Sequence, residues 1–159
     1  MKSEIYLRRV KLTDQRELQE IADEYLVSLY GDQSKALHGW LTGSNYKISW
    51  VAVDETDKIM GLLVISDKPY RDYVKIATLL VRREFSNRGI GSLLLKKAMD
   101  YLESSGKEKL IVTVSETVPE SLVFFLKNKF DIISTEVGKY KPGIVEFILQ
   151  YQKEENHEW

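Results

Sequence analysis

The chain has 159 residues, of which 43% are apolar and 30% are charged, and its formal net charge is −1. It contains no cysteine, which excludes disulfides, thiolate zinc sites and cysteine nucleophiles. With 23 basic against 24 acidic residues and no basic block interleaved with aromatics, the sequence shows no sign of a nucleic-acid partner.

The N-terminal half is expected to hold two helices and four strands. A strand at residues 5–10 leads to a helix that begins at Thr13 or Asp14 and ends at Gly31, and a short helix follows at residues 34–41. The next three strands are expected at residues 47–53, 59–66 and 74–81. Because only short breaks separate these strands, we expect an antiparallel meander.

The C-terminal half is expected to hold two further helices and three strands. A helix that ends at Gly106 precedes a strand at 110–114, and Pro119 opens a helix at 120–128. The last two strands are expected at residues 131–136 and 144–150. A strand, helix, strand crossover favours a parallel pair. The fold class is therefore α/β (α+β): a mixed, mostly antiparallel sheet of about seven strands, flanked by about four helices.

Size and composition predict a single domain over residues 1–151, followed by a polar tail at 152–159. The first residues, MKSEIYLRRVKL, lack the apolar core of a signal peptide, and no run approaches the ~18 apolar residues of a membrane span. We therefore expect a cytoplasmic protein with no membrane partner.

A glycine-containing loop, SNRGIGS at residues 86–92, joins an expected strand directly to an expected helix. The first amide groups of a helix lack partners and lie at the positive end of the helix dipole. Gly89 and Gly91 let an anion approach the backbone closely, so the loop predicts a pyrophosphate site. A tight structural turn without a ligand stays open as the alternative. The loop lacks the lysine of an NTPase phosphate loop, and no acidic residue stands at the ribose position of a dinucleotide fold.

The run LLVRREFSNRGIGSLLLKKAMDYL resembles the acetyl-CoA-binding motif of the GNAT superfamily of acyl-CoA-dependent N-acyltransferases. Leu79 and Val81 match the family's strand ending, Phe85 matches the aromatic before the loop, and residues 88–92 match the core of the loop. Ser86 stands where the family usually has Gln or Arg. The order of elements also resembles the GNAT fold over nearly the whole chain, and Arg9 with Asp14 resembles its opening.

The resemblance implies an N-acetyltransferase with acetyl-CoA as co-substrate, in which a primary amine attacks the thioester directly within a ternary complex. It implies that the strand at 74–81 splays away from the strand at 110–114 to admit the pantetheine arm. The cofactor-binding residues that it implies are Leu79, Leu80, Val81, Ser86, Asn87, Arg88, Gly89, Ile90, Gly91 and Ser92.

The catalytic base and acid are not assigned by the sequence. Lys75 has the wrong charge for a base in this position, Asp72 lies far out, and Glu116 is either a base that reaches the cleft or an exposed loop carboxylate. The family's proton-donating tyrosine is Phe125 here. The other positions of that motif are filled by Val118, Ser121 and Lys129.

Two side chains are weak candidates for assisting the leaving thiolate. Ser121 lies one helical turn before Phe125 and would hold a water near the sulfur, and Tyr140 would swing over the site from a loop. The alternative treats Phe125 and Phe124 as core residues, which leaves a non-catalytic acyl-CoA-binding sensor or regulatory module. A nucleotide-binding protein is disfavoured by the missing lysine and acidic residue.

The acceptor is expected to be a small-molecule amine or a protein or peptide amine, shaped by residues 31–45 and 137–143. Either a preference for a cationic amine or plain surface charge explains Glu24, Asp32 and Glu136. A homodimer is expected to pair along residues 144–151. His38 and His157 are too few for a metal site, so no metal is expected. Three aromatic side chains are expected in the core, with a place in the wall of a substrate pocket as the alternative: Trp40, Tyr46 and Trp50.

Overall fold

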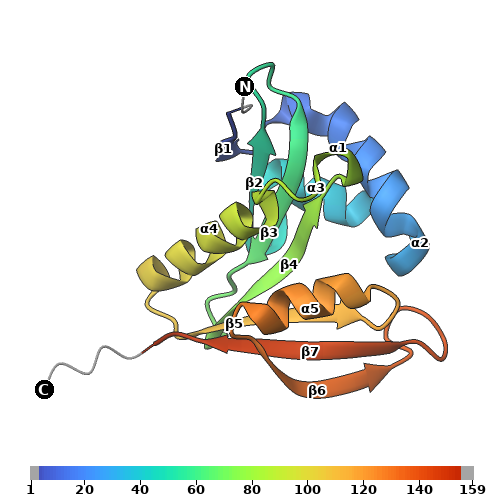
Figure 1. The fold of residues 1–159 in the computed structure, drawn as a ribbon, viewed down its shortest axis with the longest axis vertical. Coiled ribbons are helices and arrows are strands. Elements are labelled where there is room, and N and C mark those ends of the chain that lie inside the picture. Colours follow the sequence, from blue (N-terminus) through green and yellow to red (C-terminus); the bar gives the residue numbers. More distant parts are fainter. Residues whose placement is uncertain (1–3, 155–159) are drawn as a thin grey trace, which may run out of the picture.

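The computed structural model describes residues 4–154, and these form a seven-stranded sheet with helices on both faces (Figure 1). The strands are β1 Tyr6–Arg9, β2 Lys47–Val53, β3 Ile59–Ser66, β4 Tyr73–Val81, β5 Lys109–Ser115, β6 Asp131–Val137 and β7 Val145–Gln152. The helices are α1 Gln15–Ile21, α2 Val27–Tyr30, α3 Ser34–Thr42, α4 Ile90–Ser105 and α5 Pro119–Lys127. The predicted order of elements is confirmed.

The strands lie in the order β1-β2-β3-β4-β5-β7-β6, and β4 and β5 form the parallel pair. All other neighbours are antiparallel. The expected fold class is thus confirmed. Figure 1 shows that the sheet has two arms, one made of β1–β4 and one made of β5–β7, which diverge strongly in direction.

The first predicted helix is one run of chain with an irregular centre. Between α1 and α2, the segment Ala22–Leu26 is wound as a π-helix, a feature that is frequent at functional sites. Gly31, with φ +79°, ends the run as the sequence predicted. The wider turn sets the direction in which Leu26 and Tyr30 leave the helix, and both side chains line the cavity described below.

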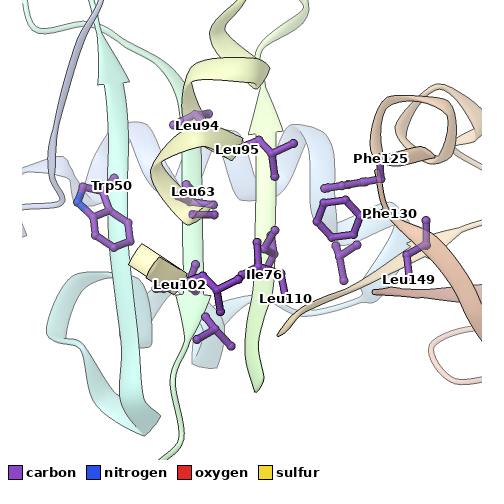
Figure 2. Close-up of a cluster of buried hydrophobic side chains, with 14 of the residues drawn as sticks. Trp50, Leu63, Ile76, Leu94, Leu95, Leu102, Leu110, Phe125, Phe130 and Leu149 are labelled. Atoms are coloured by element: carbon purple, nitrogen blue, oxygen red, sulfur yellow. The ribbon is translucent and has the colours of Figure 1, made fainter. Parts of the chain in front are cut away.

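Two hydrophobic clusters cover the two faces of the sheet, because alternate residues of each strand point to opposite sides. α1, α2 and α3 pack on one face through Leu18, Ile21, Trp40 and neighbours. α4 and α5 pack on the other face. Figure 2 shows that Ile76 and Leu110 lie between the leucines of α4 and a group formed by Phe125, Phe130 and Leu149. The core is therefore continuous across the two arms on this face.

Helix α4 lies unusually close to β3 at Gly61. A Cβ atom on Gly61 would lie 3.0 Å from the carbonyl oxygen of Leu80 and 3.1 Å from both Ile90 Cγ2 and Leu94 Cδ1. Only glycine fits this position without movement of the backbone or of buried side chains. The close contact fixes the N-terminal end of α4, where the glycine loop lies, against the sheet.

Several expectations are corrected. β7 lies between β5 and β6, so the expected dimer edge at 144–151 is not an edge, and the free edges are β1 and β6. Tyr46 is 53% exposed and not a core residue, whereas Trp40 and Trp50 are buried as expected. His157 lies outside the described residues.

The arginine that pairs with Asp14 is Arg8, not its neighbour. Arg8 Nη2 lies 2.8 Å from Asp14 Oδ1, and the same arginine also binds Asp57. Successive residues of a strand point to opposite faces, so Arg9 lies on the other side, over the ring of Trp50 at 5.4 Å. The pKa of the Asp14 carboxyl is lowered because its hydrogen bonds from Arg8 and Lys11 outweigh the effect of burial.

Within residues 4–154, none of the helices is long and apolar enough to cross a membrane.

Candidate functional site

The sheet divides between β4 and β5. The parallel register between these strands ends at Ile76 opposite Val112. At the same point β4 carries one extra residue, because Ile76 and Thr78 face consecutive residues of β3 and leave Ala77 unmatched. A β-bulge of this kind bends its strand and increases the local twist, so β4 turns away from β5 beyond Ile76. The splayed parallel pair that the resemblance implied is present.

A cavity of about 240 Å³ occupies the opening between the two strands. On the side of α5 its wall consists of Leu79, Val114, Val118, Ser121 and Phe125. These side chains are mostly apolar. They would suit a flexible chain that enters between the strands, because an apolar wall tolerates many conformations of such a chain.

On the side of α2 and α3, the cavity is polar. Its wall there includes Tyr30, Trp40, Lys47, Lys75 and Tyr140. Tyr30 and Tyr140 pack edge to face with their ring centroids 4.9 Å apart. The cavity therefore crosses the sheet: its wall is mostly apolar on the face of α5 and more polar on the face of α2 and α3.

The glycine loop has the geometry of an anion site. Asn87 and Gly89 both have left-handed backbone angles, with φ +63° and +77°. The amides of residues 87–92 donate to no acceptor among the described residues, and the first amide that does so is that of Leu93, to the carbonyl oxygen of Gly89 at 3.1 Å. Nothing lies within 4 Å of a Cβ placed on Gly89. The loop therefore fits a pyrophosphate: it presents consecutive free N–H groups to open space at a helix N-terminus.

The loop and the cavity are separate features. None of residues 86–92 lines the cavity, which reaches β4 only as far as Leu79. Leu80 points to the opposite face of the sheet, where it packs with the cluster beneath α1 and α3. Val81 packs with the cluster beneath α4. A ligand that used both features would run along the end of β4 from one to the other.

The structure brings three of the four predicted catalytic positions together. Ser121, Phe125 and Tyr140 all line the cavity. Phe125 is only 4% exposed and packs against Phe124 and Phe130, with ring centroids 5.2 and 5.0 Å away. Glu116 is exposed and is not part of the cavity wall.

The acidic residues considered for a cationic acceptor have other partners. Asp32 accepts hydrogen bonds from the amide and hydroxyl of Ser34, the first residue of α3. Glu24 lies 3.6 Å from Arg83. Glu136 lies 3.8 Å from Lys139. None of the three lines the cavity.

Lys75 and Lys47 are cavity residues whose importance the sequence did not show. Burial, together with the charges of Lys139, Lys47, Arg71 and Lys68, lowers the pKa of Lys75 to about 8. Burial also lowers the pKa of Lys47, again helped by Lys68 and Arg71. The alternating side-chain directions of a strand at residues 74–81 indicate which residues share a face with Lys75, but they do not show that this face borders a cavity.

Glu146 is a second residue that sequence analysis missed. It is only 2% exposed, and its Oε2 atom has no hydrogen-bond partner among the described residues. It lies directly opposite the cavity residue Ser115, so both share one face of the sheet. Burial raises its pKa, the charge of Glu116 raises it further, and the charge of Lys139 opposes both.

Besides burial, the charge of Glu146 raises the pKa of Tyr30 and of Tyr140. Burial raises the pKa of Tyr30 to about 12, with the charge of Glu146 as the next cause. The pKa of Tyr140 is raised for the same two reasons. Both phenols therefore stay protonated near neutral pH and can donate hydrogen bonds into the cavity. In residues 4–154, no cluster of His, Cys, Asp and Glu side chains could hold a metal ion.

Comparison with known proteins identifies the family. The acetyltransferase (GNAT) family matches residues 15–130. No curated protein sequence matches the chain. The similar solved structures include NAA60 from Arabidopsis thaliana in complex with acetyl-CoA, with TM-score 0.81 and 16% identity over 94% of this chain and 98% of that one.

Two further structures are similar in the same way. An acetyltransferase of the GNAT family from Streptococcus pneumoniae has TM-score 0.75 and 21% identity, over 95% of this chain and 100% of that one. Spermidine N-acetyltransferase from Vibrio cholerae, in complex with CoA and spermine, has TM-score 0.78 and 14% identity, over 94% and 95%. The divided sheet, the cavity through it and the free amides at α4 are features of an acyl-CoA-dependent transferase. The chain belongs to the acetyltransferase (GNAT) family.

Proposed function

We propose that this protein is an N-acetyltransferase that moves the acetyl group of acetyl-CoA to a primary amine by direct attack in a ternary complex. The observation that carries the proposal is the cavity that crosses the sheet at the bulge of β4. Because its wall includes residues from both faces of the sheet, two substrates could meet in this cavity from opposite sides. The structures of similar fold with acetyl-CoA, or with CoA and spermine, support this assignment.

Acetyl-CoA supplies a thioester whose carbonyl carbon is open to attack by an amine. We assign its pyrophosphate to the amides of the loop formed by Ser86, Asn87, Arg88, Gly89, Ile90, Gly91 and Ser92. The backbone of β4 at Leu79, Leu80 and Val81 would hold the pantetheine arm, because this stretch has no partner in β5. A free N–H of this stretch would stabilise the negative charge on the carbonyl oxygen during attack.

The reaction requires one proton to leave the amine. The amine nitrogen forms a bond to the carbonyl carbon, the bond from that carbon to sulfur breaks, and CoA departs as a thiolate. We assign the proton to Glu146, by way of the hydroxyl groups of Tyr30 and Tyr140. The raised pKa of Glu146 makes it a better base near neutral pH than an ordinary carboxylate.

The leaving thiolate receives no proton from the residue at position 125. A thiol of pKa about 8.5 is a tolerable leaving group, so a phenylalanine there is compatible with turnover. Ser121 and Tyr140 are two of the hydroxyl-bearing residues that line the cavity. The burial of Phe125 in the core favours the second candidate function, a non-catalytic acyl-CoA-binding module.

Calorimetric titration with acetyl-CoA, beside ATP and NAD, tests the binding site. Gly89→Glu should abolish acetyl-CoA binding, because the new carboxylate would repel the pyrophosphate. Gly106→Glu is the matched control, since Gly106 also has positive φ (+78°) and open space around its Cβ, but lies at the other end of α4. Equal loss in both variants, or no binding of acetyl-CoA to the unmodified protein, would refute the assignment.

Release of CoA in the presence of amines separates the two candidate functions. The absence of cysteine from the chain gives a thiol-reagent assay a low background. We expect amine-dependent release. Tight acetyl-CoA binding without any amine-dependent release would instead favour the non-catalytic module.

A further inference from the structure

Two lysines stand in one row across the sheet at the polar end of the cavity. Lys47 of β2 lies opposite Ser66 of β3, and Ser66 lies opposite Lys75 of β4. Residues that are directly opposite on neighbouring strands share a face, so both lysines point to the side covered by α3. Both line the cavity and both are partly buried.

Neither lysine has an anionic partner. No ion pair or side-chain hydrogen bond joins Lys47 or Lys75 to any other residue between positions 4 and 154. The charged groups around them are cationic, namely Lys68, Arg71 and Lys139, and their repulsion lowers the pKa of Lys75. An uncompensated pair of partly buried cations is costly, and the cost falls when an anion binds between them.

The carboxylate of Glu146 lies far from the lysines, on the residue opposite the cavity residue Ser115, and is not part of the cavity wall. Lys75 is level with Ile111 of β5, whereas Glu146 is level with Ser115. Four residues of strand separate these levels by about 13 Å. The remaining titratable groups of the polar wall are the phenols of Tyr30 and Tyr140, which stay neutral near pH 7. The cavity wall thus combines two cations with two neutral phenols, and the carboxylate of Glu146 lies outside it.

The lysines are not placed to bind the phosphates of CoA. The loop assigned to the pyrophosphate follows the end of β4 at Val81, and six residues of strand put this end about 20 Å from Lys75. The lysines also lie on the face of α3, whereas the loop opens α4 on the other face. A second anion, from a different molecule, is needed to explain them.

We propose that the acetyl acceptor is a small amine that carries a carboxylate or phosphate group, held by Lys47 and Lys75 with its amine directed toward the bulge at Ala77. This inference rests on the proposed acetyltransferase function. The bulge is only two residues along β4 from Lys75, about 7 Å, so the anionic group lies a few bonds from the amine. The same cations disfavour a protonated amine and so increase the fraction that can attack.

The size of the cavity favours a small molecule. Its volume of about 240 Å³ lies below the roughly 300–1,000 Å³ of sites for drug-sized ligands, and the acyl arm of the co-substrate occupies part of it. The charge also argues against a polyamine such as the spermine bound by the Vibrio cholerae enzyme. Lys47 and Lys75 would repel such a ligand.

Matched acceptors test the proposal. The rate of CoA release from acetyl-CoA is measured with β-alanine against propylamine, with phosphoethanolamine against ethylamine, and with spermidine. We expect kcat/KM for the anionic member of at least one pair to exceed that of its neutral partner by about tenfold or more, as for a charge-assisted hydrogen bond. The two pairs distinguish a carboxylate from a phosphate.

Variants assign the selectivity to the lysines. Lys75→Gln and Lys47→Gln should each bring the ratio within the preferred pair toward one, whereas Lys35→Gln, on the exposed surface of α3, should leave it unchanged. A preference for the neutral amines or for spermidine, or a ratio that neither cavity variant changes, would overturn the proposal. If acetyl-CoA binds but no amine turns over, β-alanine and phosphoethanolamine are titrated into the CoA-bound protein, and absence of binding would also overturn it. Failure of acetyl-CoA itself to bind would instead refute the proposed function.

Discussion

Lys75 should make the protein less stable at neutral pH than it would be with an uncharged side chain. The perturbation is Lys75→Met, which keeps most of the length and volume of the side chain. In the folded protein the pKa of Lys75 is lowered to about 8 from an ordinary value of 10.5. Each pKa unit is worth about 1.4 kcal/mol, so the variant should gain up to about 3 kcal/mol in free energy of unfolding at pH 7.

The gain should depend on pH in a defined direction. Between pH 8 and 10.5, Lys75 of the unfolded chain holds more proton than Lys75 of the folded protein, so the stability of the unmodified protein rises with pH in this window. The cost of the buried charge is fully present below pH 8 and disappears above 10.5. The difference between variant and unmodified protein should therefore shrink steadily across the window.

Urea unfolding at a series of pH values from 6 to 10 measures this difference. Lys35→Met is the control, because Lys35 is exposed on α3 and its replacement should change stability by no more than about 0.5 kcal/mol at any pH. The reasoning fails if Lys75→Met is destabilising at pH 7. It also fails if the difference stays constant as the pH rises.

Three further changes have definite expected outcomes. Gly61→Ala should destabilise the protein by about 1–3 kcal/mol through overpacking against Leu80, Ile90 and Leu94. Gly91→Ala should not destabilise it, because its Cβ would meet the Phe124 ring at an ordinary 3.5 Å. Equal unfolding midpoints for the two variants would contradict this prediction. Glu146→Gln should lower kcat/KM without lowering stability near pH 7. Stability should not fall, because the raised pKa of Glu146 means that the ionised carboxylate opposes folding above its ordinary pKa. An unchanged kcat/KM from pH 6 to 9 would show that Glu146 is not part of the mechanism. Phe125→Tyr should raise the rate of CoA release, by at most about 100-fold, the lower end of general acid catalysis; a rate that stays the same or falls would show that no proton donor is needed at this position.

The elements of the fold and the glycine loop were predictable because they are coded locally. Apolar periodicity and Gly31 and Gly106 as helix ends are properties of short stretches of chain, and the structure places the strands and helices within a few residues of the predicted ranges. The π-helix at Ala22–Leu26 was not predictable in this way, since the same apolar spacing fits a regular helix. The boundary errors of one or two residues have no effect on the site.

The polar end of the site was not predictable, because it depends on contacts between distant parts of the chain. Lys47 and Lys75 become neighbours only through the registers of two strand pairs. Glu146 looked like one surface carboxylate among many in a chain with 24 acidic residues, and only the covering of β7 by neighbouring segments buries it. The expected dimer edge failed for a related reason. The strand order β5-β7-β6 cannot be read from the order of the segments in the sequence.

The bulge at Ala77 links the fold to the site. One extra residue in β4 ends its pairing with β5 after Ile76 and leaves five half-buried positions at the end of the strand, from 77 to 81, with an unsatisfied edge toward the opening. An unpaired backbone edge in a protein interior is costly, so the divided sheet is itself an argument for a ligand with alternating polar groups along this edge. The uncompensated lysines at one side of the opening make the same argument for a second ligand. Two separate unsatisfied features, the lysines on the face of α3 and the open edge of β4, begin about 7 Å apart along one strand and fit a site where two molecules meet.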